Sequence, residues 1–142
     1  MIVRAISRYG RDLPEDCKDA RLGFDDDTEF PVIVGKAYLV YAMTVLLNHP
    51  WYYICDQDRL PYPVYEPAPL FEVVDGHISQ YWEYGYLRSK YHERANAIFA
   101  FSEWARDLYF YDRLTDQDET TIATFGRYKH LIDQEAQMGG SR

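Results

Sequence analysis

Aromatic and β-branched residues gather in short runs in the middle of the chain, and turn-forming residues separate the runs. The runs cover residues 35–41, 51–56, 70–76 and 78–82. Runs of this length and composition are typical of strands, because branched and aromatic side chains pack well on a pleated surface. The middle of the chain therefore predicts a small, strongly twisted antiparallel sheet.

Three further features refine this sheet. Residues 32–47 are apolar at both odd and even positions, as in strands that are buried on two sides or curled into a barrel. Gly35 indicates a bend or bulge. The four prolines between residues 61 and 69 exclude a central strand and favour an extended edge. Asp75-Gly76 is typical of a type I′ turn and predicts a hairpin between residues 70–74 and 77–83.

The spacing of apolar residues changes after residue 89. A helical repeat predicts a helix over residues 91–112, and Phe101, Trp104 and Tyr111 form a second apolar stripe on it. Thr115 favours the start of a second helix, which Gly139-Gly140 ends.

These segments predict one α+β domain over residues 1–142. Its parts are a strand and loop (1–29), a β-rich core (30–88) and a helical part (89–138). We expect a small curled antiparallel sheet, an SH3-like barrel, followed by two C-terminal helices. A chain of 142 residues can bury a core without disulfides or metal.

The formal net charge of −8 is spread along the chain, and Lys and Arg form no basic stripe. Binding to nucleic acid or to an anionic membrane is therefore not expected. An acidic surface favours either simple solubility or a basic protein partner. The two cysteines are too few for a disulfide framework, and no apolar run is long enough to span a bilayer. We expect a soluble cytoplasmic protein.

Known catalytic and metal-binding motifs are missing from the sequence. The four histidines lack metal-ligand spacing, and Asp25-Asp26-Asp27 lacks the rest of an EF-hand loop and is expected to be solvated. A catalytic set of Cys55, His77 and Asp75 is conceivable, but the apolar run around Cys55 would raise its pKa. No cofactor or metal is expected.

Aromatic and acidic residues between positions 56 and 84 are the best candidate for a binding site. Aromatic anchors ringed by carboxylates suit capture of a basic surface, and packing beneath the C-terminal helices is the alternative. The predicted partner-binding residues are Asp56, Asp58, Tyr62, Tyr65, Glu66 and Tyr84.

Two other hypotheses remain open at this point. Asp56 and Asp58, on a loop after a buried strand, could act with His77 in a small metal- or ligand-dependent enzyme. Alternatively, the stripe of Phe101, Trp104 and Tyr111 could bury against a second copy in a homo-oligomer such as a homodimer.

The motifs of residues 30–84 resemble those of a class of small, uncharacterised bacterial proteins. The matching motifs are Gly35-Lys36-x-Tyr38-x-Val40-Tyr41, Trp51-Tyr52-Tyr53-Ile54-x-Asp56, Pro67-x-x-Leu70-Phe71-Glu72-Val73-Val74-Asp75-Gly76 and Ser79-x-x-Trp82. Some of those proteins resemble immunity proteins of polymorphic or contact-dependent toxin systems. The resemblance implies an SH3-like curled sheet and a non-enzymatic protein that occludes a basic toxin domain. It implies no catalytic residue.

Overall fold

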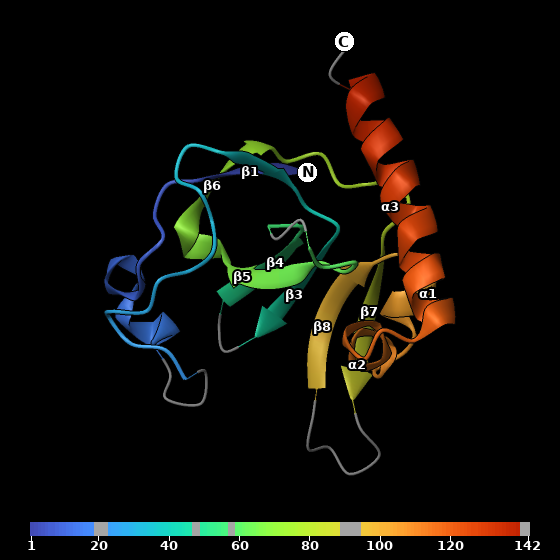
Figure 1. Ribbon diagram of the computed structural model, residues 1–142, viewed down its shortest axis with the longest axis horizontal. Coiled ribbons are helices and arrows are strands. Elements are labelled where there is room, and N and C mark those ends of the chain that lie inside the picture. Colours follow the sequence, from blue (N-terminus) through green and yellow to red (C-terminus); the bar gives the residue numbers. More distant parts are fainter. Residues whose placement is uncertain (19–22, 47–48, 57–58, 89–94, 140–142) are drawn as a thin grey trace.

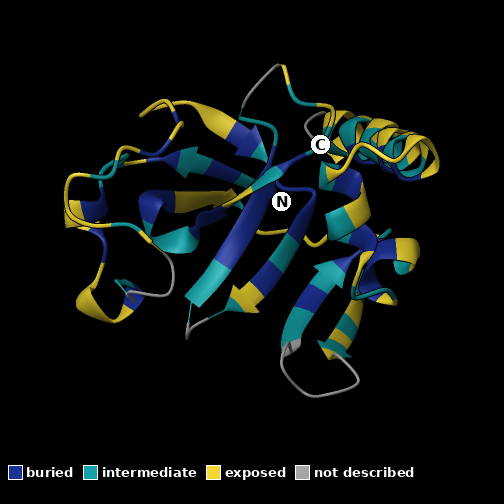
Figure 2. Cartoon of the chain, turned by 60° about the horizontal axis from the view of Figure 1, so that its bottom comes forward, coloured by how far each residue is buried: buried dark blue, intermediate teal, exposed yellow. Residues whose placement is uncertain are grey.

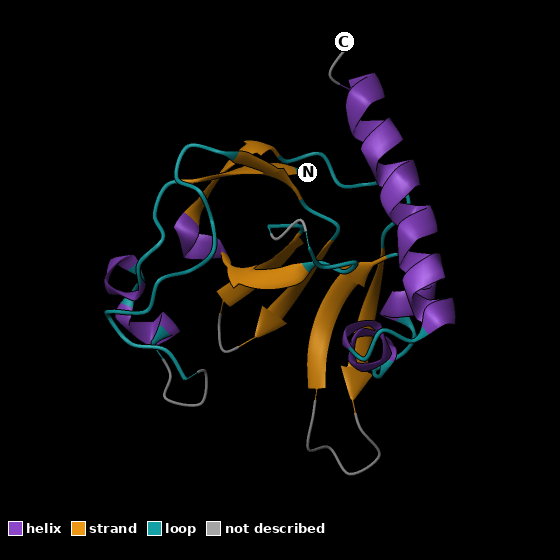
Figure 3. Cartoon of the chain, in the orientation of Figure 1, coloured by secondary structure: helices purple, strands orange, loops and turns teal. Residues whose placement is uncertain are grey.

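The computed structural model describes residues 1–18, 23–46, 49–56, 59–88 and 95–139. It has an α+β fold (Figure 3). The strands are β1 (Ile2–Ala5), β2 (Ala37–Leu39), β3 (Ala42–Leu46), β4 (His49–Ile54), β5 (Val64–Pro67), β6 (Phe71–Asp75), β7 (Glu83–Arg88) and β8 (Ala95–Ala100). The α-helices are α1 (Ser102–Ala105), α2 (Phe110–Thr115) and α3 (Glu119–Gly139), and short 3-10 helices are η1 (Gly10–Asp12), η2 (Glu15–Cys17) and η4 (Ala68–Leu70).

The strands form two antiparallel sheets (Figure 1). One has the strand order β2-β1-β6, and the other has the order β5-β4-β3-β8-β7. Among the described strands neither sheet closes on itself, so the structure does not confirm the expected SH3-like barrel. The expected α+β class and antiparallel pairing are confirmed, but the strands form two sheets and not the one sheet that was expected.

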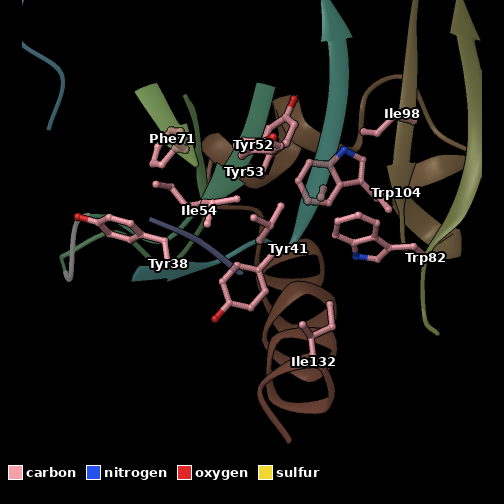
Figure 4. Packing of buried hydrophobic residues seen from close by; sticks show 14 of the residues in the cluster. Tyr38, Tyr41, Tyr52, Tyr53, Ile54, Phe71, Trp82, Ile98, Trp104 and Ile132 are labelled. Carbon is pink, nitrogen blue, oxygen red and sulfur yellow. The ribbon is translucent and has the colours of Figure 1, made fainter. Parts of the chain in front are cut away.

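The three-stranded sheet covers the five-stranded sheet near β4. Tyr52 of β4 lies 5.7 Å from Phe71 of β6, ring centre to ring centre, and Tyr38 of β2 contacts the same ring (Figure 4). All three side chains are buried, as is Val3 in the middle of the three-stranded sheet. Aromatic contacts therefore join the two sheets.

Helices cover the other face of the five-stranded sheet. Trp104 of α1 lies 4.7 Å from Tyr53 of β4, and Tyr111 of α2 lies 5.0 Å from it. The long helix α3 runs along one side of the molecule (Figure 1) and contacts Tyr41 through the ring of Phe125. The apolar face predicted for the last helix is confirmed at Phe125 and Ile132, both of which are buried.

Several local predictions are confirmed. Strands lie near the predicted positions at β1, β4 and β6. The proline-rich segment forms β5, which is an edge strand. Gly35 has a φ of 90°, which only glycine adopts easily, at the predicted bend.

The predicted hairpin at Asp75-Gly76 is wrong. β6 pairs with β1, and the residues between Asp75 and Glu83 form no strand. The carboxylate of Asp75 instead accepts hydrogen bonds from the backbone N–H of His77, at 3.0 Å, and from its ring. Asp-Gly is compatible with several kinds of tight turn, so it does not by itself specify a hairpin. Pairing of β6 with β1 accompanies burial of the Phe71 side chain, and a hairpin between residues 70–74 and 77–83 would not require this burial.

The predicted helix over residues 91–112 is also wrong. β8 occupies part of its first half and pairs with both β3 and β7, and the short helices α1 and α2 come after it. Residues 91–94 lie outside the described part of the chain. The helical part thus begins after residue 101, and Asp118 rather than Thr115 caps α3 through the backbone N–H of Thr121.

Candidate functional site

The structure does not bring the six predicted partner-binding residues together. Tyr65 and Glu66 lie on β5, whereas Tyr84 lies on β7 at the opposite edge of the five-stranded sheet. Three strands separate β5 from β7, which corresponds to about 19 Å at the usual spacing between strands. Asp58 lies outside the described residues.

Glu66 faces the interior. It pairs with Tyr52 across the β4–β5 ladder, so both side chains lie on the face that the three-stranded sheet covers. Only 3% of Glu66 is exposed. Asp56 follows β4, and both of its carboxylate oxygens are buried, with no N–H or hydroxyl group of the described residues donating to them. Because both carboxylates are buried, neither can contact a partner protein in the folded structure.

The two buried acids interact directly. A hydrogen bond between Asp56 and Glu66 requires one proton, because two carboxylates are both acceptors. Burial, together with the neighbouring Asp56, raises the pKa of Glu66 to about 9. Burial also raises the pKa of Asp56, although the bond to Glu66 and the charge of Lys36 oppose this shift. The raised pKa of Glu66 favours a pair that keeps one proton at neutral pH, with Glu66 as the donor and Asp56 as the acceptor.

The three predicted tyrosines differ in exposure. Tyr62 is half-buried against the core, whereas Tyr65 is 40% exposed and Tyr84 is 59% exposed. The ring of Tyr65 contacts Trp51 at 5.7 Å and Tyr111 at 6.0 Å, which fixes its position on the helix-covered face. Tyr65 is thus an exposed aromatic ring on a well-packed support.

Trp51 connects Tyr65 to an acidic surface that the sequence did not identify as a binding site. We call residues 12–18 and 23–29 the acidic segment. It carries seven carboxylates and one cation, Lys18. The carboxylates are Asp12, Glu15, Asp16, Asp25, Asp26, Asp27 and Glu29, all exposed (Figure 2).

Contacts of Phe24 and Asp16 attach the acidic segment to β4 of the five-stranded sheet. Phe24 packs against Trp51 at 6.4 Å, and Trp51 in turn contacts Tyr65. Nε2 of His49, at the start of β4, lies 2.9 Å from Oδ1 of Asp16. The sequence pattern that could have identified this surface is the run from Phe24 to Asp27, in which one aromatic residue precedes three carboxylates.

The residues of the enzyme hypotheses are poorly placed for catalysis. His77 and Asp75 contact each other at an exposed turn, where the ring of His77 is almost fully solvated. Burial raises the pKa of the Cys55 thiol to about 11, and Lys129 only partly offsets this effect. Within the described residues, no three His, Cys, Asp or Glu side chains are grouped to hold a metal ion.

A pocket of about 640 Å³ lies elsewhere, between the end of α3 and the three-stranded sheet. Its walls include Ile2, Leu39 and Ile78, and Asp75 and Glu135 supply carboxylates. None of the five predicted residues that the structure describes lines it.

Comparison with known proteins gives no relative. No family model, curated protein or solved structure matches this chain. Over the described part of the chain, no helix has the length and apolar character needed to cross a membrane.

Proposed function

We propose that this chain is a non-enzymatic, cytoplasmic protein-binding module that captures a basic protein surface. In its most concrete form it is a bacterial immunity protein that occludes a basic toxin domain. The contact surface consists of the acidic segment and Tyr65. One observation carries the proposal: ring contacts through the buried Trp51 link the exposed ring of Tyr65 to Phe24, which belongs to a segment with seven exposed carboxylates.

The two parts of this surface have different roles. The carboxylates attract a basic partner over a distance, which raises the association rate at low salt. Tyr65 supplies apolar area and a hydroxyl at the contact, as tyrosine does in many interfaces. Because Trp51 and Tyr111 already hold its ring, little conformational entropy is lost on binding.

The test begins with capture of proteins from the source cell's lysate at low salt. The partner is then purified, and its Kd is measured at two ionic strengths. The variant Glu15→Gln/Asp26→Asn/Asp27→Asn removes three charges from the acidic segment. We expect it to weaken binding by at least about tenfold at low salt and by less at high salt.

A matched control changes the net charge equally at other places. Glu72→Gln/Asp116→Asn/Glu119→Gln neutralises three exposed carboxylates outside the acidic segment. We expect this variant to bind within about threefold of the native chain, since salt screens exposed charges that lie far from the contact surface and they contribute little to the binding free energy. Equal weakening by both variants, or no protein retained at low ionic strength, would contradict the proposal.

A further inference from the structure

The buried acids lie beneath the strand that carries Tyr65. Tyr65 and Glu66 are consecutive on β5, so their side chains point to opposite faces of the sheet. β5 is an edge strand with β4 as its one neighbour in the described sheet. Glu66 lies within the β4–β5 ladder and Asp56 follows the end of β4, so repulsion between the two acids would act on the pairing of β5 with β4.

Few groups near Asp56 and Glu66 could stabilise a second negative charge on the pair. The groups that act on Asp56 are Lys36, which precedes β2, and Cys55 and Tyr111. Lys36 is the one cation among these described groups, and it lies on an exposed turn with its Nζ over the ring of Tyr38. Cys55 and Tyr111 remain neutral at moderate pH, because burial raises the pKa of each.

We propose that the proton shared by Asp56 and Glu66 controls the attachment of β5 to β4. With the proton present, a hydrogen bond joins the two acids. Without it, two buried carboxylates repel each other, and β5 separates from β4 and removes Tyr65 from the acidic surface. The effect on partner binding rests on the proposed function, whereas the separation of β5 does not.

The direction of the pH effect follows from the pKa of Glu66. A raised pKa in the folded state means that the folded protein, with β5 paired to β4, binds the proton more tightly than the unfolded chain does. The stabilisation is complete below the ordinary pKa of glutamate, and it is lost as pH rises towards about 9. The protein should therefore become less stable over this range, which includes neutral pH.

The experiment compares the native chain with Glu66→Gln, Asp56→Asn and the control Glu72→Gln, without any partner. Glutamine imitates protonated Glu66, because its amide donates to Asp56 at every pH. We expect the Tm of the native chain and of Glu72→Gln to fall between pH 6 and pH 9.5. The Tm of Glu66→Gln should stay nearly constant, whereas Asp56→Asn should keep part of the fall, because burial alone still raises the pKa of Glu66.

Pulsed hydrogen exchange locates the change. After correction for intrinsic exchange rates, protection of the β5 amides in the native chain should fall by about tenfold per pH unit as one proton is released. Protection of β3, the central strand, should fall much less. Infrared spectroscopy of the native chain supplies a second readout, a protonated carboxyl band at pH 7 that disappears near pH 9.

An equal pH slope in Glu66→Gln and the native chain would overturn the inference, as would the absence of a protonated carboxyl band at pH 7. Equal loss of protection in β3 and β5 would also overturn it. None of these measurements involves a partner, so they remain decisive if the proposed function fails.

Discussion

The hydroxyl of Tyr41 donates a 2.6 Å hydrogen bond to Oδ1 of Asp133, which lies 92 residues later on α3. The second oxygen of Asp133 accepts a 2.9 Å hydrogen bond from Nζ of Lys129, one helical turn earlier. The ring of Tyr41 is buried and meets Phe125 edge-on. One tyrosine thus joins the long helix to the sheet by both an apolar and a polar contact.

Replacing Tyr41 by Phe should lower the free energy of unfolding by about 1–2 kcal/mol. The ring contact remains, but the carboxylate of Asp133 loses one of its two donors. Urea unfolding monitored by circular dichroism measures the change. Tyr109→Phe, at a ring that is 52% exposed, is the matched control and should have almost no effect. Equal losses in the two variants would show that the hydrogen bond contributes nothing.

Gly85 of β7 lies against α1, and a Cβ at this position would overlap the carbonyl oxygen of Ala105. Gly85→Ala should therefore destabilise the fold by about 3 kcal/mol or more, because the backbone of β7 or α1 must move. Gly126→Ala is the opposite case, since a Cβ there meets no atom within 4 Å. We expect it to stabilise α3 by about 0.5–1 kcal/mol, measured by the same unfolding curves. A small effect of Gly85→Ala would contradict the close packing of α1 on β7.

Asp118 accepts hydrogen bonds from the backbone N–H of Thr121, at 3.0 Å, and from its hydroxyl, at 2.7 Å. These bonds lower the pKa of Asp118. Their stabilising effect is thus present above the ordinary pKa of aspartate, and it is lost as pH falls below that value. Asp118→Ala should lower the Tm at pH 7 more than Asp116→Ala does, and the difference should shrink at pH 3. Equal Tm values for the two variants at pH 7 would show that Asp118 is not the cap of α3.

The Cys55 thiol should react slowly with Ellman's reagent at pH 8. With a pKa of about 11, its thiolate fraction is roughly 10²-fold smaller than that of an ordinary cysteine. The measurement is made in a Cys17→Ala background, so that Cys55 is the single thiol. Rapid modification would contradict the raised pKa and would favour the hypothesis of a catalytic cysteine.

Part of the fold could be read from the sequence because it depends on local chemistry. The prolines around β5 leave an edge position as the suitable place for that strand. Gly35 fits the bend because its φ of 90° is strained for other residues. The strand at β4 follows from its aromatic content, which suits a buried pleated surface.

The predictions failed where a distant partner decided the outcome. Ala95, Ile98 and Ser102 fit a helical spacing, but pairing with β3 and β7 makes residues 95–100 the strand β8. Phe101 and Trp104 then lie in the core, so the stripe predicted to form an oligomer is not available on the surface. Sequence spacing describes which residues share a face, and it does not describe which element covers that face.

The sequence by itself determined the acidic character of the chain, its α+β class and the residue types available for binding. Only the tertiary structure decided their roles. The pairing of β4 with β5 turns Glu66 inward, where burial and Asp56 raise its pKa, and the packing of Phe24 on Trp51 links the acidic segment to Tyr65. The physical reason is that burial and pKa depend on neighbours that are remote in the chain, whereas charge and intrinsic conformational preference belong to each residue alone.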